Sequence, residues 1–235
     1  MEIKALASSS NGNCYFISDG KTNLLIEAGI NINRIRKHID LISLAGCLIT
    51  HEHKDHSKSA KDIAKYCNVY SSALTLELLD FGTYNFRKKP LEEKEIYNIG
   101  TFKVIPFKTE HDAIDPFGYL IASTITNEKL LFATDTYYIK HKFKGLNYIM
   151  IECNYSKEIL DYNIDKGRIL KVNSNRLIRS HFELSNVKKF LEAQDLSKVK
   201  QIYLLHLSDG NSNEELFKRE IQALTGKEVI VCKKE

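Results

Sequence analysis

Three histidines and an aspartate lie within a few positions of one another in this chain. Residues 50–56 read THEHKDH and come directly after a short apolar run. Side chains at alternate positions of an extended segment point the same way, so His51 and His53 can converge on one ion. A tight turn into the helical stretch that follows would bring Asp55 and His56 towards a second ion. Imidazole and carboxylate donors in this pattern are typical ligands of Zn²⁺, Mn²⁺ or Fe²⁺.

The same segment has a simpler interpretation as a polar helix entry at the surface, with Asp55 or Ser57 as its N-cap. A lone histidine would favour that interpretation. Several histidines at ligand spacing, directly after a strand that is predicted to be buried, favour a metal site instead.

The elements that must position these residues are short apolar runs flanked by Gly, Asn, Asp or Lys. β-Branched and aromatic residues are common in the runs, which therefore predict strands. Helical periodicity predicts three helices. The first covers 59–66, the second begins after Ser185 as its N-cap, and the third covers 214–224 and ends at Gly226. Strands interleaved with helices, with no linker between them, predict a single α/β domain over residues 1–235. The predicted strands are 15–18, 23–26, 47–49, 102–106, 118–121, 130–133, 148–152, 202–205 and 229–231.

Further acids and histidines come just after predicted strands. They are Glu27, His111, Asp135 and His206. Strand ends gather at one rim of a sheet, and the loops there carry chemistry. Taken alone, Asp135 could be a turn residue and His206 a hydrogen-bonded core histidine. The recurrence of one arrangement at several strands favours ligands.

Composition places the chain among ordinary globular proteins. Hydrophobic residues make up 43% and charged residues 27% of the chain, and the formal net charge is +4. That charge is compatible with an anionic substrate but too small to indicate a nucleic-acid coat protein. The five cysteines form no C-x-x-C motif, which favours buried thiols in a reducing cytoplasm. No signal peptide or membrane span is recognisable, so we expect a soluble cytoplasmic protein.

Together these residues resemble the metallo-β-lactamase superfamily, and within it the YycJ/WalJ-type branch of DNA-exonuclease-like proteins. The superfamily motifs can be followed as an acid after a strand (Glu27), the HEHKDH segment, and then His111, Asp135 and His206. The resemblance implies a four-layer αββα sandwich with metal ions on the rim between its two sheets. The segments that carry it are ASSSNGNC at 7–14, LLIEAG at 24–29, HDAIDP at 111–116, TDT at 134–136 and HLS at 206–208.

The resemblance also implies two divalent metal ions, zinc or manganese, as cofactors. A carboxylate suits a bridge between them, because one oxygen can face each cation. Two such ions can share a hydroxide and stabilise the attacking and leaving oxygens of a phosphodiester. Asp55 would then be catalytic as well as a ligand, because the nucleophile depends on the second ion. The implied ligands are His51, His53 and His111 for the first ion, Asp55, His56 and His206 for the second, and Asp135 between them.

Two positions depart from the superfamily pattern. Glu27 stands where aspartate is usual, and we expect it beside a ligating imidazole as a hydrogen-bond acceptor, outside the ligand set. His181 matches the histidine that protonates the leaving oxygen in related phosphodiesterases, provided that Glu183 replaces the serine after it. In a competing register Glu183 itself takes the histidine's position. A solvent-facing histidine near a helix start is the simpler alternative for His181.

Candidate substrate contacts come from loops. Ser9, Ser10 and Asn11 could place backbone N–H groups against a phosphate, or could form a plain hairpin turn. Ser208 follows His206 closely, in a loop that also has the composition of a turn.

Two segments, 84–90 and 137–142, mix aromatic residues with lysine, arginine or histidine. Such a mixture suits base stacking and phosphate contact, or else a solvated surface. The second segment follows Asp135 closely enough to line the site.

These features lead to a dinuclear metal phosphodiesterase acting on nucleic acid, an exonuclease, as the leading hypothesis. A rival is the same chemistry on a cyclic nucleotide or cyclic oligonucleotide, of the kind viruses use against immune signals. Other classes are a thiolester or lactone hydrolase of the glyoxalase II type, and an inactive binding protein. The expected partner is a nucleic acid or nucleotide substrate, and no association with a membrane is expected. A homodimer is possible on the sequence.

Overall fold

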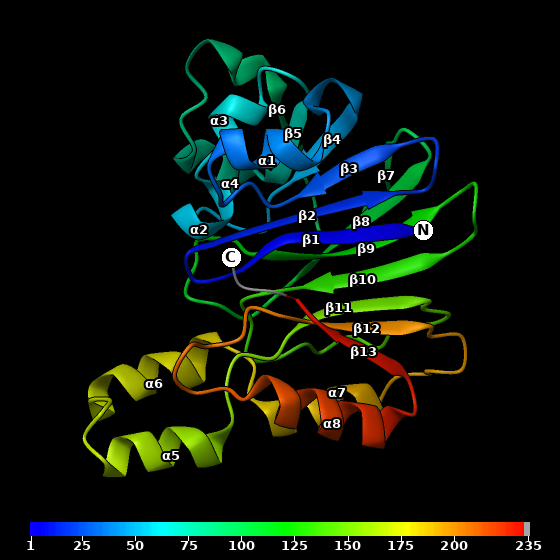
Figure 1. Ribbon diagram of the computed structural model, residues 1–235. Coiled ribbons are helices and arrows are strands. Elements are labelled where there is room, and N and C mark those ends of the chain that lie inside the picture. Colours follow the sequence, from blue (N-terminus) through cyan, green and yellow to red (C-terminus); the bar gives the residue numbers. More distant parts are fainter. Residues whose placement is uncertain (233–235) are drawn as a thin grey trace. The chain divides into compact units, whose positions relative to one another are not determined.

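The computed structural model describes residues 1–232, including the side chains of all of them except 171–173. The chain divides into two compact units. Unit 1 comprises Met1–Lys108 and Ala113–Glu128, and unit 2 comprises Thr109–Asp112 and Lys129–Cys232. Figure 1 labels their helices and strands. The single domain over 1–235 stays a prediction.

Unit 1 contains a six-stranded sheet whose strands follow one another in sequence order. The first three strands pair antiparallel, and parallel pairing begins between β3 and β4. The ends of β3 and β4 therefore lie at one edge, where Glu27 and the motif at 50–56 follow. The strands are β1 (Glu2–Ser9), β2 (Gly12–Ser18), β3 (Asn23–Ile26), β4 (Leu44–Leu48), β5 (Asn68–Ser72) and β6 (Lys88–Leu91).

Helices cover one face of this sheet. Leu25, Cys47 and Val69 are direct neighbours across β3, β4 and β5, and they share a buried core with Ile35 and Ile63 of the helices. Burial of this apolar row holds the strand ends in place. The helices are α1 (Ile32–His38), α2 (Lys54–Ser57), α3 (Ala60–Ile63) and α4 (Ala73–Leu78), with 3₁₀ turns η1 (Leu41–Ser43) and η2 (Gly82–Arg87).

Unit 1 also contains an antiparallel ladder of β7 (Tyr97–Ile99), β8 (Phe102–Lys108) and β9 (Phe117–Ser123). Asp19, in the turn between β2 and β3, forms hydrogen bonds to this ladder. The Asp19 carboxylate accepts hydrogen bonds from Thr101 Oγ1 at 2.6 Å, from Ser123 Oγ at 2.7 Å and from the Thr22 N–H at 2.8 Å.

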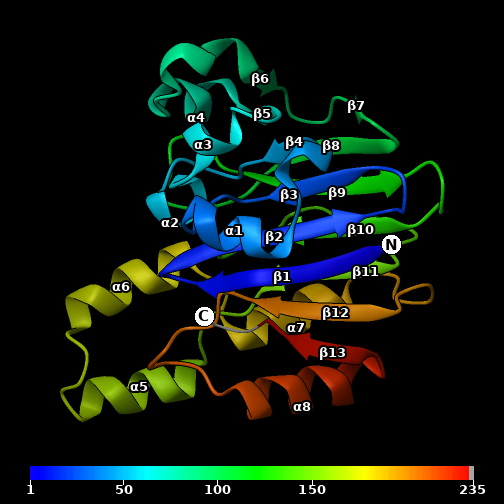
Figure 2. The same ribbon diagram turned by 45° about the horizontal axis from the view of Figure 1, so that its top comes forward.

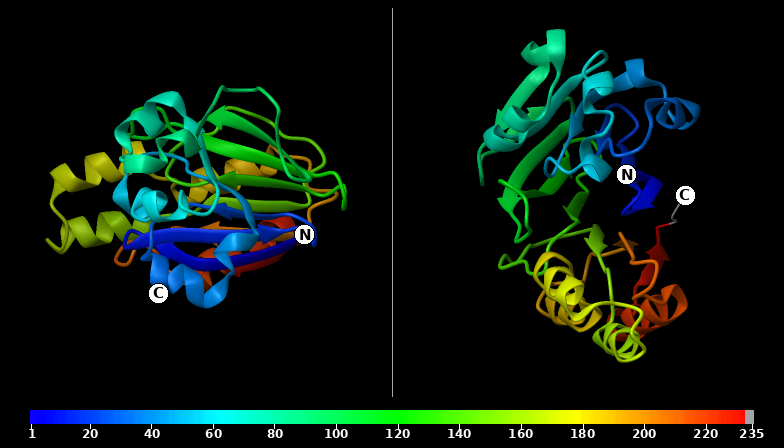
Figure 3. Two further views of the ribbon diagram at one scale, coloured as in Figure 1. Left: turned by 90° about the horizontal axis from the view of Figure 1, so that it is seen from above. Right: turned by 90° about the vertical axis from the view of Figure 1, so that its left-hand side faces the viewer.

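Unit 2 is built on parallel strands, of which β10, β11 and β12 are almost entirely buried. The strands are β10 (Lys129–Ala133), β11 (Tyr148–Glu152), β12 (Gln201–Leu205) and β13 (Glu228–Val231), with β11 between β10 and β12. The helices are α5 (Lys157–Asp165), α6 (Lys171–Ser180), α7 (Leu184–Glu192) and α8 (Glu214–Thr225). Figure 2 shows α7 and α8 beside β12 and β13, and Figure 3 shows α5 and α6 as a helical pair. Val187 and Leu191 of α7, and Phe217 and Ile221 of α8, are fully buried.

Each predicted strand occurs in the structure, and the helix that ends at Gly226 is α8. Strands β5, β6 and β7 and helices α1, α4, α5 and α6 were not predicted. The helix expected over 59–66 is the shorter α3. Ser185 as a helix cap is wrong: α7 begins one residue earlier, and the Glu183 carboxylate accepts the N–H groups of Ser185 and Asn186.

The cysteines are all buried and free of disulfide bonds, as expected from their lack of paired spacing. Among the helices of residues 1–232, none combines the length and the apolar composition needed to cross a lipid bilayer.

Candidate metal and active site

In unit 1, Glu27 links the ends of β3 and β4 to the histidine motif. It directly follows β3, is fully buried, and has a left-handed backbone with φ of 63°. Its carboxylate oxygens accept the Thr50 N–H, each at 3.3 Å, and one lies 3.4 Å from His56 Nδ1. Burial raises the pKa of Glu27, and the neighbouring His56 opposes that shift. Glu27 therefore holds the His56 ring by one nitrogen and leaves the other for a further contact.

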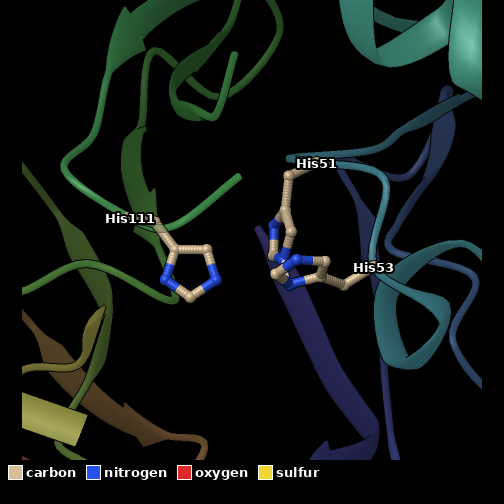
Figure 4. A group of neighbouring side chains, drawn as sticks. All are labelled: His51, His53 and His111. Atoms are coloured by element: carbon tan, nitrogen blue, oxygen red, sulfur yellow. Dashed lines mark hydrogen bonds between the residues drawn. The ribbon is translucent and has the colours of Figure 1, made fainter. Parts of the chain in front are cut away.

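The imidazoles of His51 and His53 meet directly. Their rings pack edge to face with 4.6 Å between centroids, and 3.1 Å separates His51 Nε2 from His53 Nδ1 (Figure 4). The His51 and His56 centroids are 4.2 Å apart. His51 Nδ1 lies 2.9 Å from Thr50 Oγ1, which fixes the orientation of its ring. Three imidazoles this close present several ring nitrogens to a cation. His111, also drawn in Figure 4, belongs to unit 2.

The short helix α2 turns the chain sharply after His53, which is its N-cap residue. The turn places His56 Nε2 3.3 Å from Asp55 Oδ2 and 3.1 Å from Asn13 Nδ2. The backbone after β3 packs tightly here, because a Cβ at Gly29 would lie 1.6 Å from the Asp55 carbonyl oxygen. Glycine is therefore required at position 29.

In unit 2, Asp135 and His206 follow β10 and β12 and contact each other. Both are buried and left-handed, with φ of 46° and 51°, and His206 Nδ1 lies 2.6 Å from Asp135 Oδ1. Thr134 Oγ1 donates to the same oxygen at 2.9 Å. His111 Nε2 lies 3.6 Å from Asp135 Oδ2, and its Nδ1 lies 2.9 Å from the Ser180 carbonyl. The Asp135 carboxylate thus lies between two of the predicted ligand histidines.

The sequence interpretation missed one member of this cluster, Glu152. It is the last residue of β11 and is fully buried. Its Oε1 lies 2.7 Å from His181 Nδ1 and 3.2 Å from His206 Nδ1, while Oε2 accepts the N–H groups of Thr136 and Phe182. An acid at the end of a predicted strand was the available signal. Asp135 was selected because it is an acid close to the end of a predicted strand, and the same reasoning applies to Glu152.

The charges of this cluster are tightly linked. Burial works to raise the pKa of Glu152, but the His181 charge and hydrogen bonds from both histidines lower it. Burial works to lower the pKa of both His181 and His206, but the neighbouring carboxylates outweigh it. Glu152 raises the pKa of His181. Asp135, with a smaller contribution from Glu152, raises the pKa of His206 to about 10. Burial lowers the pKa of His111. In the absence of a cation, protons on the histidines therefore offset the negative charge of the buried carboxylates.

This donor set fits a divalent cation. One donor atom each from Asp135, Glu152, His181 and His206 lies within 4.8 Å of the others. A cation bound by Asp135 and His206 would replace the proton that holds this pair together. Mixed nitrogen and oxygen donors suit borderline metals such as zinc and manganese.

The structure separates the two candidates for the proton donor. His181 is half-buried, and its ring centroid is 5.5 Å from those of both His111 and His206. The Glu183 carboxylate instead caps α7 through Ser185 and Asn186. His181, and not Glu183, is brought into the cluster, while its chemical role stays a prediction.

The candidate substrate contacts have different surroundings. Ser10 and Asn11 form the tip of the β1–β2 hairpin and line a cavity of about 780 Å³ that also reaches Asp55. Ser9 is buried, and its hydroxyl accepts the Asn11 N–H at 3.3 Å. Ser208 is half-buried and its hydroxyl accepts the N–H of Asn211, so it organises its own turn.

Residues 22–207 match the family model for the beta-lactamase superfamily domain. The chain belongs to this family. It is 28% identical to exodeoxyribonuclease YycJ of Bacillus anthracis, over 92% of this chain and 86% of that protein. It is 29% identical to exodeoxyribonuclease WalJ of Streptococcus pneumoniae serotype 2, over 90% of this chain and 83% of that protein. The crystal structure of the metallo-β-lactamase fold protein YhfI from Bacillus subtilis superposes with a TM-score of 0.75 at 14% identity, covering 99% and 95% of the two chains.

These comparisons confirm the resemblance, the metallo-β-lactamase fold class and the expectation of a hydrolytic enzyme. The family and the clusters of histidine and aspartate also indicate the use of a divalent metal. The role of each site residue, the identity of the metal and the number of ions remain proposals.

Proposed function

We propose that the protein is a metal-dependent phosphodiesterase that degrades nucleic acid as an exonuclease, with DNA as the preferred substrate. The observation that carries this proposal is the position of His181 beside Asp135, Glu152 and His206. A proton donor next to a metal-binding cluster suits the cleavage of a phosphodiester, whose leaving alkoxide must be protonated. The preference for DNA is supported by the names of the curated relatives, both of which are exodeoxyribonucleases.

We further propose two divalent cations, zinc or manganese, as cofactors. When bound, they would supply an activated water and stabilise negative charge on the phosphodiester oxygens. Within unit 1, Glu27 would orient His56 through Nδ1. Within unit 2, the Asp135 carboxylate would be a ligand, and its negative charge would offset part of the charge of the bound cations. The proposed ligands are His51, His53, Asp55 and His56 of unit 1, and His111, Asp135 and His206 of unit 2.

The chain's own acid–base chemistry centres on the pair of Glu152 and His181. Glu152 holds His181 by Nδ1 at 2.7 Å and is itself fixed by two backbone N–H groups. This arrangement leaves Nε2 of His181 as the nitrogen that gives a proton to the leaving oxygen. The Glu152 carboxylate raises the pKa of His181, which favours the protonated imidazole that a general acid needs.

Ser10 and Asn11 are proposed to contact a phosphate of the substrate. They lie at the same cavity as Asp55 and Lys58. The lining carries both lysines and carboxylates, and Lys61 pairs with Asp80 at 2.8 Å. The charges of the cavity lining therefore do not by themselves favour an anionic ligand. The proposal depends on the position of Ser10 and Asn11 at the same cavity as Asp55.

A substrate screen tests the function. Purified protein loaded with Mn²⁺ or Zn²⁺ would be incubated with end-labelled DNA and RNA, with cyclic nucleotides, and with a thiolester. We expect stepwise release of nucleotides from DNA. Exclusive cleavage of a cyclic nucleotide would favour the rival phosphodiesterase, and cleavage of the thiolester alone would contradict phosphodiester chemistry.

The screen needs a variant without the proposed second ion. Asp55→Ala combined with His56→Ala should abolish hydrolysis, because the activated water depends on both cations. The matched control is His38→Ala combined with Asp62→Ala, which changes the same residue types outside the cluster. Activity of the first variant within a few-fold of the control would contradict the mechanism.

A further inference from the structure

Unit 2 contains a cavity of about 350 Å³ beside the catalytic cluster. One wall is formed by the segment 137–142, which begins two residues after Asp135, and another by the face of α7. Phe182, the residue after His181, also lines it. The volume lies in the range of about 300–1,000 Å³ that is typical of small-molecule sites. A nucleobase with its sugar fits within it.

Aromatic rings dominate the lining. Phe182 and Phe190 are 1% and 7% exposed, with centroids 6.3 Å apart, and provide an apolar floor. Tyr137 and Tyr138 also line the cavity, yet they are 40% and 55% exposed. Large aromatic side chains left open to solvent at a cavity are suited to stacking on the flat face of a base.

The charged groups that line the cavity all carry positive charge. Lys140, Lys142 and Lys189 contribute to it, and neither aspartate nor glutamate is among its lining residues. Asn186 adds an exposed amide that can pair with a base edge. An apolar ligand would need no such cations, whereas a nucleotide carries an aromatic base and a phosphate together.

Hydrogen bonds anchor the tyrosine segment to the catalytic cluster. Thr136 Oγ1 donates to the Tyr138 carbonyl at 2.9 Å, and the Tyr137 N–H donates to the Glu110 carbonyl at 3.1 Å. The N–H of Thr136 donates to Glu152, the carboxylate that holds His181. The backbone that carries these tyrosines is therefore tied to the carboxylate that holds His181.

We propose that this cavity binds the base of a nucleotide that adjoins the cleaved phosphodiester, by stacking on Tyr137 and Tyr138. Lys140 and Lys142 contact the phosphate of the same nucleotide. The inference rests on the proposed function and extends it, because it assigns base contacts to residues outside the proposed metal ligands.

Binding without metal tests the cavity separately from catalysis. The full chain in EDTA would be titrated with dAMP and with deoxyribose 5-phosphate, which has the same phosphate and no base. We expect the wild type to bind dAMP more tightly, and Tyr138→Ala to weaken dAMP binding by about tenfold. Deoxyribose 5-phosphate should bind both proteins equally. Lys140→Ala combined with Lys142→Ala should weaken both ligands and reduce the salt dependence of binding.

The matched control is Tyr162→Ala, which removes another exposed tyrosine of unit 2 that lies outside the cavity. Its dAMP affinity should equal that of the wild type. Equal dAMP affinity for Tyr138→Ala and Tyr162→Ala, with both variants folded by circular dichroism, would overturn the inference.

A kinetic experiment separates this inference from the proposed function. Oligonucleotides carrying one abasic residue at successive positions would be digested by wild type and Tyr138→Ala. At one position the abasic residue should raise KM for the wild type and have little effect on the variant. If the wild type digests DNA but no position shows this difference, the cavity inference fails alone. If dAMP binds as expected and no phosphodiester is cleaved, the proposed function fails alone.

Discussion

At the scale of single residues, three of the buried site residues occupy a costly backbone conformation. Glu27, Asp135 and His206 are all left-handed, although none is glycine, and each comes one or two residues after a parallel strand. Such conformations persist where the surroundings over-determine them, and they concentrate at functional sites. Here the surroundings are charged contacts, from Glu27 to His56 and from Asp135 to His206.

The residue scale also gives the sharpest test of the proton donor. His181→Ala should lower turnover by about 10²- to 10⁴-fold on a substrate with a poor leaving group. With a p-nitrophenyl ester the loss should shrink, because that leaving group needs no proton. Steady-state kinetics on both substrates make the comparison.

Glu183→Ala is the control for His181. It removes the side-chain cap of α7 and should cost about 1 kcal/mol of stability, with no dependence on the leaving group. An equal loss on both substrates for His181→Ala would mean that His181 binds or orients the substrate.

At the scale of elements, the turn after β3 and helix α2 support each other. The Ala28 N–H donates to the His56 carbonyl, and the Ser59 N–H donates to the Ala28 carbonyl, both at 2.8 Å. The absent side chain of Gly29 allows this approach, and neither backbone segment can retreat without breaking these bonds.

Gly29→Ala should therefore lower the free energy of unfolding by about 3 kcal/mol or more. Gly210→Ala is the matched control, because a Cβ there meets no atom within 4 Å. Urea denaturation of both variants measures the difference. Equal urea midpoints for the two variants would show that the turn into α2 accommodates the added methyl group at little cost in stability.

A second prediction at this scale concerns the Asp19 junction. Burial works to raise the pKa of Asp19, but hydrogen bonds from Thr101, Thr22 and Ser123 lower it to about 2. A lowered folded-state pKa stabilises the fold above the ordinary aspartate pKa near 4, and this contribution is lost as pH falls towards 2. Asp19→Asn should thus cost about 2 kcal/mol at pH 7 and much less near pH 2. Thermal unfolding at both pH values tests this, and a loss independent of pH would contradict it.

At the scale of the whole molecule, both units carry part of the proposed ligand set. In the absence of metal, each cluster contains buried carboxylates beside imidazoles, an arrangement that bound cations would stabilise. Metal binding should therefore raise the stability of the folded chain as a whole.

We predict two ions per chain after reconstitution with zinc or manganese, and a lower Tm in EDTA. Metal analysis and calorimetry on the same samples measure both quantities. One ion or fewer per chain would contradict the dinuclear proposal, and an unchanged Tm would contradict a filled site.

Sequence alone determined the parts of this protein that depend on local spacing. The H-x-H-x-D-H motif and the strand that precedes it need only short-range periodicity, so both could be predicted. The rule that acids and histidines follow strands selected Glu27, Asp135 and His206 for the same reason.

Only the tertiary structure decided which distant residues meet. Glu152 contacts His181 and His206, which are 29 and 54 residues away, because β11 lies between β10 and β12 in the parallel sheet. Strand order is set by the packing of whole strands, and no local pattern encodes it. Likewise, the sequence favoured His181 as the proton donor but left the competing register with Glu183 open. Only the fold assigned Glu183 to the cap of α7 and His181 to the cluster.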